Sequence, residues 1–131
     1  MKRISLVTFA LLGLLLLGSG LWSSVSVAAP RRESAVLEFV ETVKLAGVLL
    51  RGEYLVVHDE ERMARGEPCT YVYAGKEQDQ AKLVVSFHCI HVDREMVDTT
   101  KLTFSRRIAP YNTAEITEIQ FAGSKDGHKV P

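Results

Sequence analysis

The sequence Cys69-Thr-Tyr-Val-Tyr-Ala74, followed by Leu83-Val-Val-Ser-Phe-His-Cys-Ile-His-Val92, is typical of a β-hairpin that carries two cysteines. Both stretches are rich in β-branched and aromatic residues, and a polar segment from Gly75 to Ala81 separates them. The second stretch is apolar on both of its faces. We therefore expect Leu83–Val92 to form one continuous strand in the centre of a sheet, where both faces are covered.

The register of this hairpin predicts a disulfide. If the chain folds about Asp79, Cys69 lies opposite Cys89, and Tyr71 lies opposite Phe87. Directly opposed residues of an antiparallel pair approach closely enough for a bridge between cysteines. These are the two cysteines of the whole chain, and in an oxidising compartment such a pair forms a disulfide. Two buried free thiols are the alternative.

Most of the remaining sequence also alternates between apolar and polar residues, which indicates strands. A charged connector from Asp59 to Gly66 has enough helix-forming residues for one turn, and the polar tail after Gly123 is expected to lie loosely on the surface. The pattern predicts an all-β fold, a small antiparallel sandwich or barrel of about 6–8 strands. The further predicted strand segments are Val36–Val43, Val48–Leu50, Tyr54–His58, Thr99–Ile108 and Ala114–Ala122.

The first 28 residues have the layout of a secretory signal peptide. Lys2 and Arg3 precede an uncharged apolar run from Ile4 to Trp22, and small residues then lead to a cleavage position after Ala28. We expect a hydrophobic signal helix in residues 1–28, a single β-domain in residues 29–131, and a secreted or periplasmic protein. Because about 20 apolar residues suffice to span a bilayer, an uncleaved N-terminal anchor is the alternative, and only then is the membrane a partner.

The charge balance excludes one class of partner. The chain has 16 basic and 16 acidic residues, and removal of the signal peptide leaves a slight acidic excess. A nucleic-acid-binding domain needs a concentrated basic face, so we expect no nucleic-acid partner. The partner expected here is an envelope protein or a small ligand of unknown identity.

The sequence does not indicate an enzyme. It has neither a glycine-rich phosphate-binding loop nor a serine in a Gly-x-Ser-x-Gly turn. Its paired carboxylates fall in loops or on alternating strand positions, where solvated charge is the ordinary interpretation. We therefore predict no catalytic residues and no cofactor.

Histidines offer an alternative, a copper or zinc site. The candidate ligands are His58, His88, His91 and His128. On a regular strand His88 and His91 point to opposite faces and cannot share a metal. Cys89, His91 and Met96 are similar to the cysteine-histidine-methionine run of blue-copper proteins, with His58 as the upstream histidine. A single residue separates Cys89 from His91, however, and the predicted disulfide removes Cys89.

Aromatic residues supply a second candidate site. Tyr71 and Tyr73 share one face of their predicted strand, where they would line a ligand pocket or pack against neighbouring strands. The function predicted from the sequence is a non-catalytic binding or envelope interaction module that uses sheet edges or the loop Asp59–Gly66. The alternative is a periplasmic carrier of a small ligand or of copper or zinc.

Parts of the chain resemble a family of small secreted bacterial β-proteins of unknown function. The shared features are a Gly-x-Tyr-x-Val strand start, a charged loop and a cysteine-bounded hairpin. In this chain they are Gly52–Val56, Arg65–Tyr73 and Lys82–Cys89, and the segment Thr117–Gly123 is also similar. The resemblance implies a compact secreted β-domain, and it implies no activity and no site residues.

Overall fold

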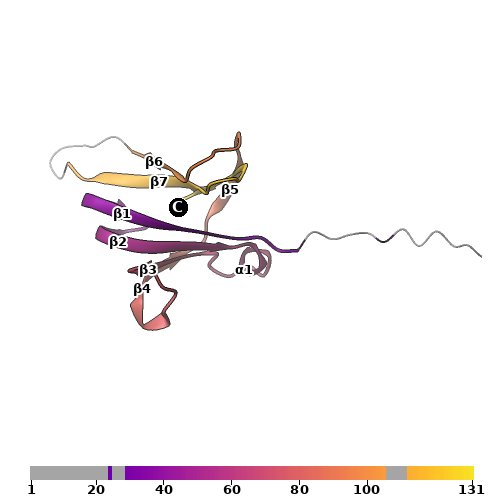
Figure 1. The fold of residues 1–131 in the computed structure, drawn as a ribbon, viewed down its shortest axis with the longest axis horizontal. Helices are drawn as coiled ribbons and strands as arrows, with labels where there is room; N and C mark the ends of the chain where they lie inside the picture. Colours follow the sequence, from indigo (N-terminus) through magenta and orange to yellow (C-terminus); the bar gives the residue numbers. More distant parts are fainter. Residues whose placement is uncertain (1–23, 25–28, 106–111) are drawn as a thin grey trace, which may run out of the picture.

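The structure, a computed structural model, describes residue 24, residues 29–105 and residues 112–131. Within these residues, eight strands form one curled sheet with the shape of half a barrel (Figure 1). The all-β prediction and the predicted number of strands are confirmed. The predicted signal helix falls in residues 1–28, which lie outside the described part except for Ser24. Among the described residues, every helix is too short to cross a bilayer.

The longest strands are consecutive in the sequence. β1 (Arg32–Leu45) and β2 (Val48–Asp59) form an antiparallel hairpin. Ala46 and Gly47 make its turn with φ values of 46° and 84°, and positive φ at both central positions is the hairpin geometry that follows the twist of the strands. An irregularity between Phe39 and Val43 shifts the register further along the hairpin.

The predicted cysteine hairpin is present with a different register. β3 (Thr70–Ala74) pairs antiparallel with β4 (Leu83–Phe87) after a short 3₁₀ helix, η1 (Gln80–Lys82). Tyr71 lies opposite Ser86, so the predicted pairing with Phe87 is wrong. The 3₁₀ helix occupies residues that a simple fold about Asp79 would place in the β3–β4 ladder. The pairing of β3 with β4 therefore differs from the predicted one.

The predicted central strand Leu83–Val92 is interrupted at His88 and Cys89. Its first half is β4, and its second half is β5 (Ile90–Asp93), which pairs with β8 (Asp126–Lys129). The strand path is β4-β3-β2-β1-β7-β8-β5, in which β7 is Ala114–Gln120, so both halves lie at ends of the sheet and the central placement is wrong. The two ends of the path are therefore consecutive in the chain and are joined by His88 and Cys89.

The sheet is mixed, which corrects the prediction of a purely antiparallel fold. β7 (Ala114–Gln120) pairs in parallel with β1 through Val43 and Ala114, and it also pairs antiparallel with β8 and with β6 (Lys101–Phe104). Figure 1 shows β6 and β7 on one side of β1, with β3 and β4 on the side of β2. The parallel pair joins the first four strands to the last four.

The charged connector and the polar tail are both ordered parts of the fold. The charged connector forms one helical turn, α1 (Glu60–Ala64), whose N-terminal amides at Glu61 and Arg62 donate to the Asp59 carboxylate. The polar tail, predicted to be loose, instead contains β8, in which Gly127 and His128 are buried. Because β8 pairs on both sides, the tail belongs to the folded domain.

The core lies inside the curl. Its buried side chains come from both halves of the strand path, so the halves share one apolar interior. Burial of this apolar surface is the main favourable term in the folding of such a domain. The buried core residues are Phe39, Val43, Leu45, Leu50, Val56, Val72, Phe87, Ile116, Ile119 and Phe121.

Candidate metal centre

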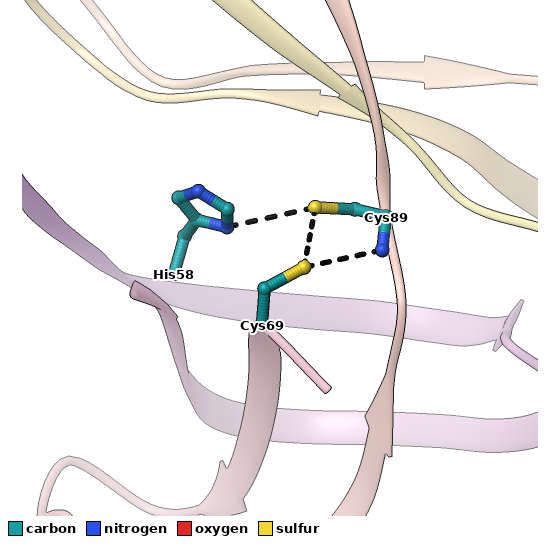
Figure 2. Close-up of side chains that lie close together, drawn as sticks. All are labelled: His58, Cys69 and Cys89. Atoms are coloured by element: carbon teal, nitrogen blue, oxygen red, sulfur yellow. Dashed lines mark hydrogen bonds between the residues drawn. The ribbon is translucent and has the colours of Figure 1, made fainter. Parts of the chain in front are cut away.

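Two groups of candidate ligands share His58 near the β4–β5 connection: His58, Cys69 and Cys89 form one, and Glu33, His58 and His128 form the other, with the ligand atoms of each group within 4.8 Å of one another. His58 is near the end of β2, Cys69 immediately precedes β3, Cys89 lies in the connection, and His128 is in β8. Figure 2 shows the side chains of His58, Cys69 and Cys89 pointing toward one another. The four residues come from distant parts of the sequence, and the curl of the sheet brings them together.

Cys89 is the centre of this cluster. Its Sγ lies 3.6 Å from Nδ1 of His58, 3.7 Å from Nδ1 of His128 and 2.7 Å from Sγ of Cys69. The backbone N–H of Cys89 also donates to Cys69 Sγ at 3.2 Å (Figure 2). The predicted partners Cys69 and Cys89 are thus in contact, but as free cysteines at a distance longer than the about 2.05 Å of a disulfide.

The cluster is shielded from solvent. His58 and Cys69 are almost completely buried, with 0% and 1% of their surface exposed, and His128 is 2% exposed. Cys89 is half-buried. The imidazole rings of His58 and His128 lie against each other with centroids 3.8 Å apart, and Phe121 packs beside both. A ligand bound here would be largely desolvated and would reach solvent on the side of Cys89.

Burial sets the protonation of His58. Desolvation and the neighbouring His128 lower the pKa of His58 to about 4, so its imidazole is neutral at physiological pH. Neutral imidazole is the form that coordinates a metal. The ring nitrogen Nε2 of His58 is buried without a hydrogen-bond partner, although polar groups at such depth are normally satisfied. The ring is therefore incompletely satisfied by the described residues alone.

A buried carboxylate orients His128. Nε2 of His128 lies 3.2 Å from Oε2 of Glu33, and both side chains are less than a tenth exposed. Since the carboxylate accepts the Nε2 proton, the lone pair of Nδ1 is left to face Cys89. This carboxylate–histidine arrangement is the usual outer support of a metal-ligating imidazole. Arg31 lies over the other oxygen of Glu33 at 3.7 Å and partly balances its charge.

The two sulfur–nitrogen distances from Cys89 can be compared with those of a tetrahedral S₂N₂ site. Zinc bonds of about 2.3 Å to sulfur and about 2.0–2.1 Å to nitrogen put the two ligand atoms about 3.6 Å apart. The observed distances from Cys89 Sγ to the two imidazole nitrogens, 3.6 and 3.7 Å, agree with this value. The sulfurs, at 2.7 Å, are about 1 Å closer than in such a site, so metal binding requires one thiol to rotate outward.

A cation would also change the state of the thiols. Burial, followed by the contact with Cys69, raises the pKa of the Cys89 thiol to about 12. Without a cation the Cys89 thiol is therefore protonated at physiological pH. A bound divalent ion deprotonates its thiol ligands, so binding would release protons.

Only two of the four histidines predicted as ligands belong to this cluster. His58 and His128 converge, whereas His88 is exposed. Nε2 of His91 lies 3.1 Å from Asp93 and 3.7 Å from Asp126 in an exposed group. Met96 is 58% exposed. Of the residues in the predicted blue-copper run, Cys89 and His58 are therefore in contact, whereas His91 and Met96 lie outside the cluster.

The tyrosines have other partners. The hydroxyl of Tyr71 donates to the carbonyl of Pro68 at 2.6 Å and accepts from Arg62, which also stacks over the ring. Tyr73 is buried, and its hydroxyl accepts from Gln78. A surface groove has a lining that includes neither tyrosine: Glu38, Phe39, Val40, Glu41, Val43, Phe104, Ser105 and Ala114. The ligand-binding role of Tyr71 and Tyr73 stays a prediction.

Sequence reasoning missed one functional residue, Glu33. It lies directly opposite His58 in the β1–β2 ladder. Continuing the register of the turn, in which Leu45 pairs with Val48, would place Glu33 opposite Glu60 instead. The irregularity between Phe39 and Val43 shifts the pairing by two residues. If this bulge had been predicted from the sequence, the register would have placed Glu33 opposite His58.

Comparison of the chain with protein-family models, with curated proteins and with solved structures found no match. The resemblance to small secreted bacterial β-proteins therefore stays a prediction.

Proposed function

We propose that this protein is an exported β-domain that binds one zinc ion through Cys69, Cys89, His58 and His128. The observation that carries the proposal is the position of Cys89 Sγ, in contact with one thiol and within 3.7 Å of two imidazole nitrogens. Cys₂His₂ is a common donor set of closed, four-coordinate zinc sites. Export is inferred from the basic and apolar layout of residues 1–28.

Charge favours zinc over copper(I). Two thiolates and two neutral imidazoles carry a charge of about −2, which a divalent ion neutralises in the buried site. A monovalent copper ion would leave one negative charge uncompensated, and burial of a net charge is costly. Glu33 adds a further negative charge behind His128, and this also favours the divalent ion.

The test is a metal titration of the full chain, expressed with its own N-terminal segment and reduced before use. Isothermal titration calorimetry should show one zinc ion per chain. Titration with Co(II) should give the visible absorption bands of a tetrahedral ion together with sulfur-to-metal charge transfer. Cys89→Ser and His128→Ala should lose both signals. His88→Ala and His91→Ala, which change exposed histidines beside the cluster, should keep them.

Two outcomes would contradict the proposal. One is the absence of stoichiometric zinc binding to the reduced chain. The other is one-to-one binding of copper(I) that zinc in excess does not displace, which would make the site a copper centre.

The interaction module predicted from the sequence has weaker support. β4 and β5 end the strand path, so each has one edge that the described sheet does not pair, and such edges can accept a further strand. Edges of this kind occur in most open sheets, whereas the contacts of Cys89 Sγ with one thiol and two imidazole nitrogens are typical of a metal site. The metal site therefore carries the stronger inference.

A further inference from the structure

We infer that Cys69 and Cys89 form a redox switch, in which a low-molecular-weight disulfide oxidises them to a Cys69–Cys89 disulfide and thereby releases the zinc. This inference rests on the proposed zinc site and adds its regulation. Thiolate sulfur is the metal ligand, so a disulfide removes half of the donor set. Metal occupancy and oxidation of the pair would then exclude each other.

The geometry allows both states with little movement. The two sulfurs are in contact, and Cys89 lies in the connection between β4 and β5, outside the strand ladders. An outward rotation of one thiol admits the metal, and an inward rotation brings the two sulfurs to bonding distance for oxidation by the external disulfide. The disulfide predicted from the sequence and the zinc site are therefore two states of the same pair.

Exposure sets the order of the exchange. Cys69 is 1% exposed, whereas Cys89 is half-buried, so an external disulfide can reach Cys89 first. The Cys89 thiolate attacks one sulfur of the oxidant, forms a mixed disulfide and expels one thiolate of the oxidant. Cys69 then attacks the Cys89 sulfur and expels the second thiolate.

The reaction balances in atoms and electrons. The zinc dithiolate and one disulfide give the Cys69–Cys89 disulfide, two free thiolates and a zinc ion. The two protein sulfurs lose two electrons in total, and the sulfur–sulfur bond of the oxidant gains them. The released thiolates take up protons from the buffer according to their own equilibria.

The first test uses the zinc-loaded full chain and oxidised glutathione. Zinc release is followed with a chromophoric indicator, and free thiols are counted by alkylation and mass spectrometry. We expect one zinc ion released for every two thiols lost, and dithiothreitol should restore both. His88→Ala is the matched control beside Cys89 and should behave as the unchanged chain does.

The second test uses the two cysteine variants to examine the order of attack. Cys69→Ser should accumulate a glutathione adduct at Cys89, because the second attack is blocked. Cys89→Ser should leave Cys69 unmodified over the same time. An adduct on Cys69 at a comparable rate would overturn the order, and circular dichroism checks that both variants fold. If either variant fails to fold, the zinc-to-thiol ratio of the unchanged chain still decides whether the switch exists.

The two proposals fail in different ways. If the reduced chain binds no zinc, both the zinc site and its regulation are wrong. If zinc binds but stays bound while the disulfide forms, or leaves while both thiols remain, the switch alone is wrong.

Discussion

The imidazole rings of His58 and His128 lie against each other, 3.8 Å between centroids, although one belongs to β2 and the other to β8. Both rings turn Nδ1 toward the same sulfur, that of Cys89. His128 is further fixed by Glu33, whereas Nε2 of His58 has no hydrogen-bond partner among the residues that the structure describes. Both histidines thus direct Nδ1 toward Cys89, but only His128 is held by a carboxylate. The effect of that carboxylate on metal binding can therefore be measured by changing Glu33.

The support of His128 by Glu33 leads to the first prediction. Glu33→Gln should weaken zinc binding by about 10–100-fold, because removal of an outer partner of a metal ligand has effects of this size. Competition titration against a zinc indicator measures the change. Glu38→Gln, an exposed change on the same strand, is the control and should bind zinc as the unchanged chain does. Equal affinities of the two variants would show that Glu33 does not support a ligand.

Zinc removal should lower thermal stability. At a free zinc concentration 100 times the Kd, binding stabilises the folded state by about 2.7 kcal/mol. For a domain of this size that corresponds to a rise in Tm of about 10–20 °C. Differential scanning calorimetry of the reduced chain, with zinc and with a chelator, measures the difference. His128→Ala should show almost no zinc-dependent shift, and a full shift in that variant would exclude His128 as a ligand.

The ion pair between Arg94 and Glu118 should make stability depend on pH. Two hydrogen bonds of 2.8 Å from Arg94 lower the pKa of Glu118 in the folded state. The pair therefore adds stability above the unfolded pKa of about 4.3, and the gain is lost as the pH falls through the lower folded value. Urea denaturation without zinc should show the chain more stable than Glu118→Gln at pH 7, with a smaller gap at pH 3.

A control for this pH effect is available on the same strand. Glu115→Gln removes an exposed ion pair with Lys44 and should change stability by less than about 1 kcal/mol at either pH. If the difference in free energy of unfolding between the unchanged chain and Glu118→Gln stays constant from pH 7 to pH 3, the stability lost in the variant is not electrostatic.

Gly127 is tightly enclosed by the same ion pair. A Cβ at this position would lie 2.5 Å from Oε1 of Glu118 and 3.1 Å from Cγ of Arg94. Gly127→Ala should therefore displace the Glu118 carboxylate and destabilise the fold by about 1–3 kcal/mol, the usual range for overpacking. Urea denaturation measures the loss. The double variant Gly127→Ala with Glu118→Ala should lose less stability than the sum of the losses in the two single variants. Strictly additive losses would contradict the proposed clash.

Local patterns predicted the strands that are rich in β-branched and aromatic residues. β3 and the single helical turn of α1 lie where β-branched and helix-forming residues indicated them, whereas β2 joins the two predicted segments Val48–Leu50 and Tyr54–His58 into one strand. β8 was missed because Asp126-Gly-His-Lys129 has no apolar alternation. Its burial depends on long-range contacts of His128 with Glu33 and Cys89, and local sequence does not encode these.

The candidate site was predictable in its residues but not in its arrangement. His58 and His128 were predicted as metal ligands and Cys89 as part of a blue-copper run, whereas Cys69 was predicted only as the disulfide partner of Cys89. Their convergence depends on the interruption of the strand at His88 and Cys89 and on the parallel pairing of β1 with β7. Both are properties of the whole sheet. Glu33 depends in addition on a register shift of two residues, which no local pattern specifies.

The connection at His88 and Cys89 also constrains how the sheet can come apart. It joins the two strands at opposite ends of the path, so the sheet and the covalent chain together form a ring. To separate its halves, the parallel contact of β1 with β7 must break while the connection at Cys89 still links them. A metal ion or a disulfide that ties Cys89 to Cys69 would hold this connection beside the start of β3, so the chemical state of one thiol would limit how far the two halves can part.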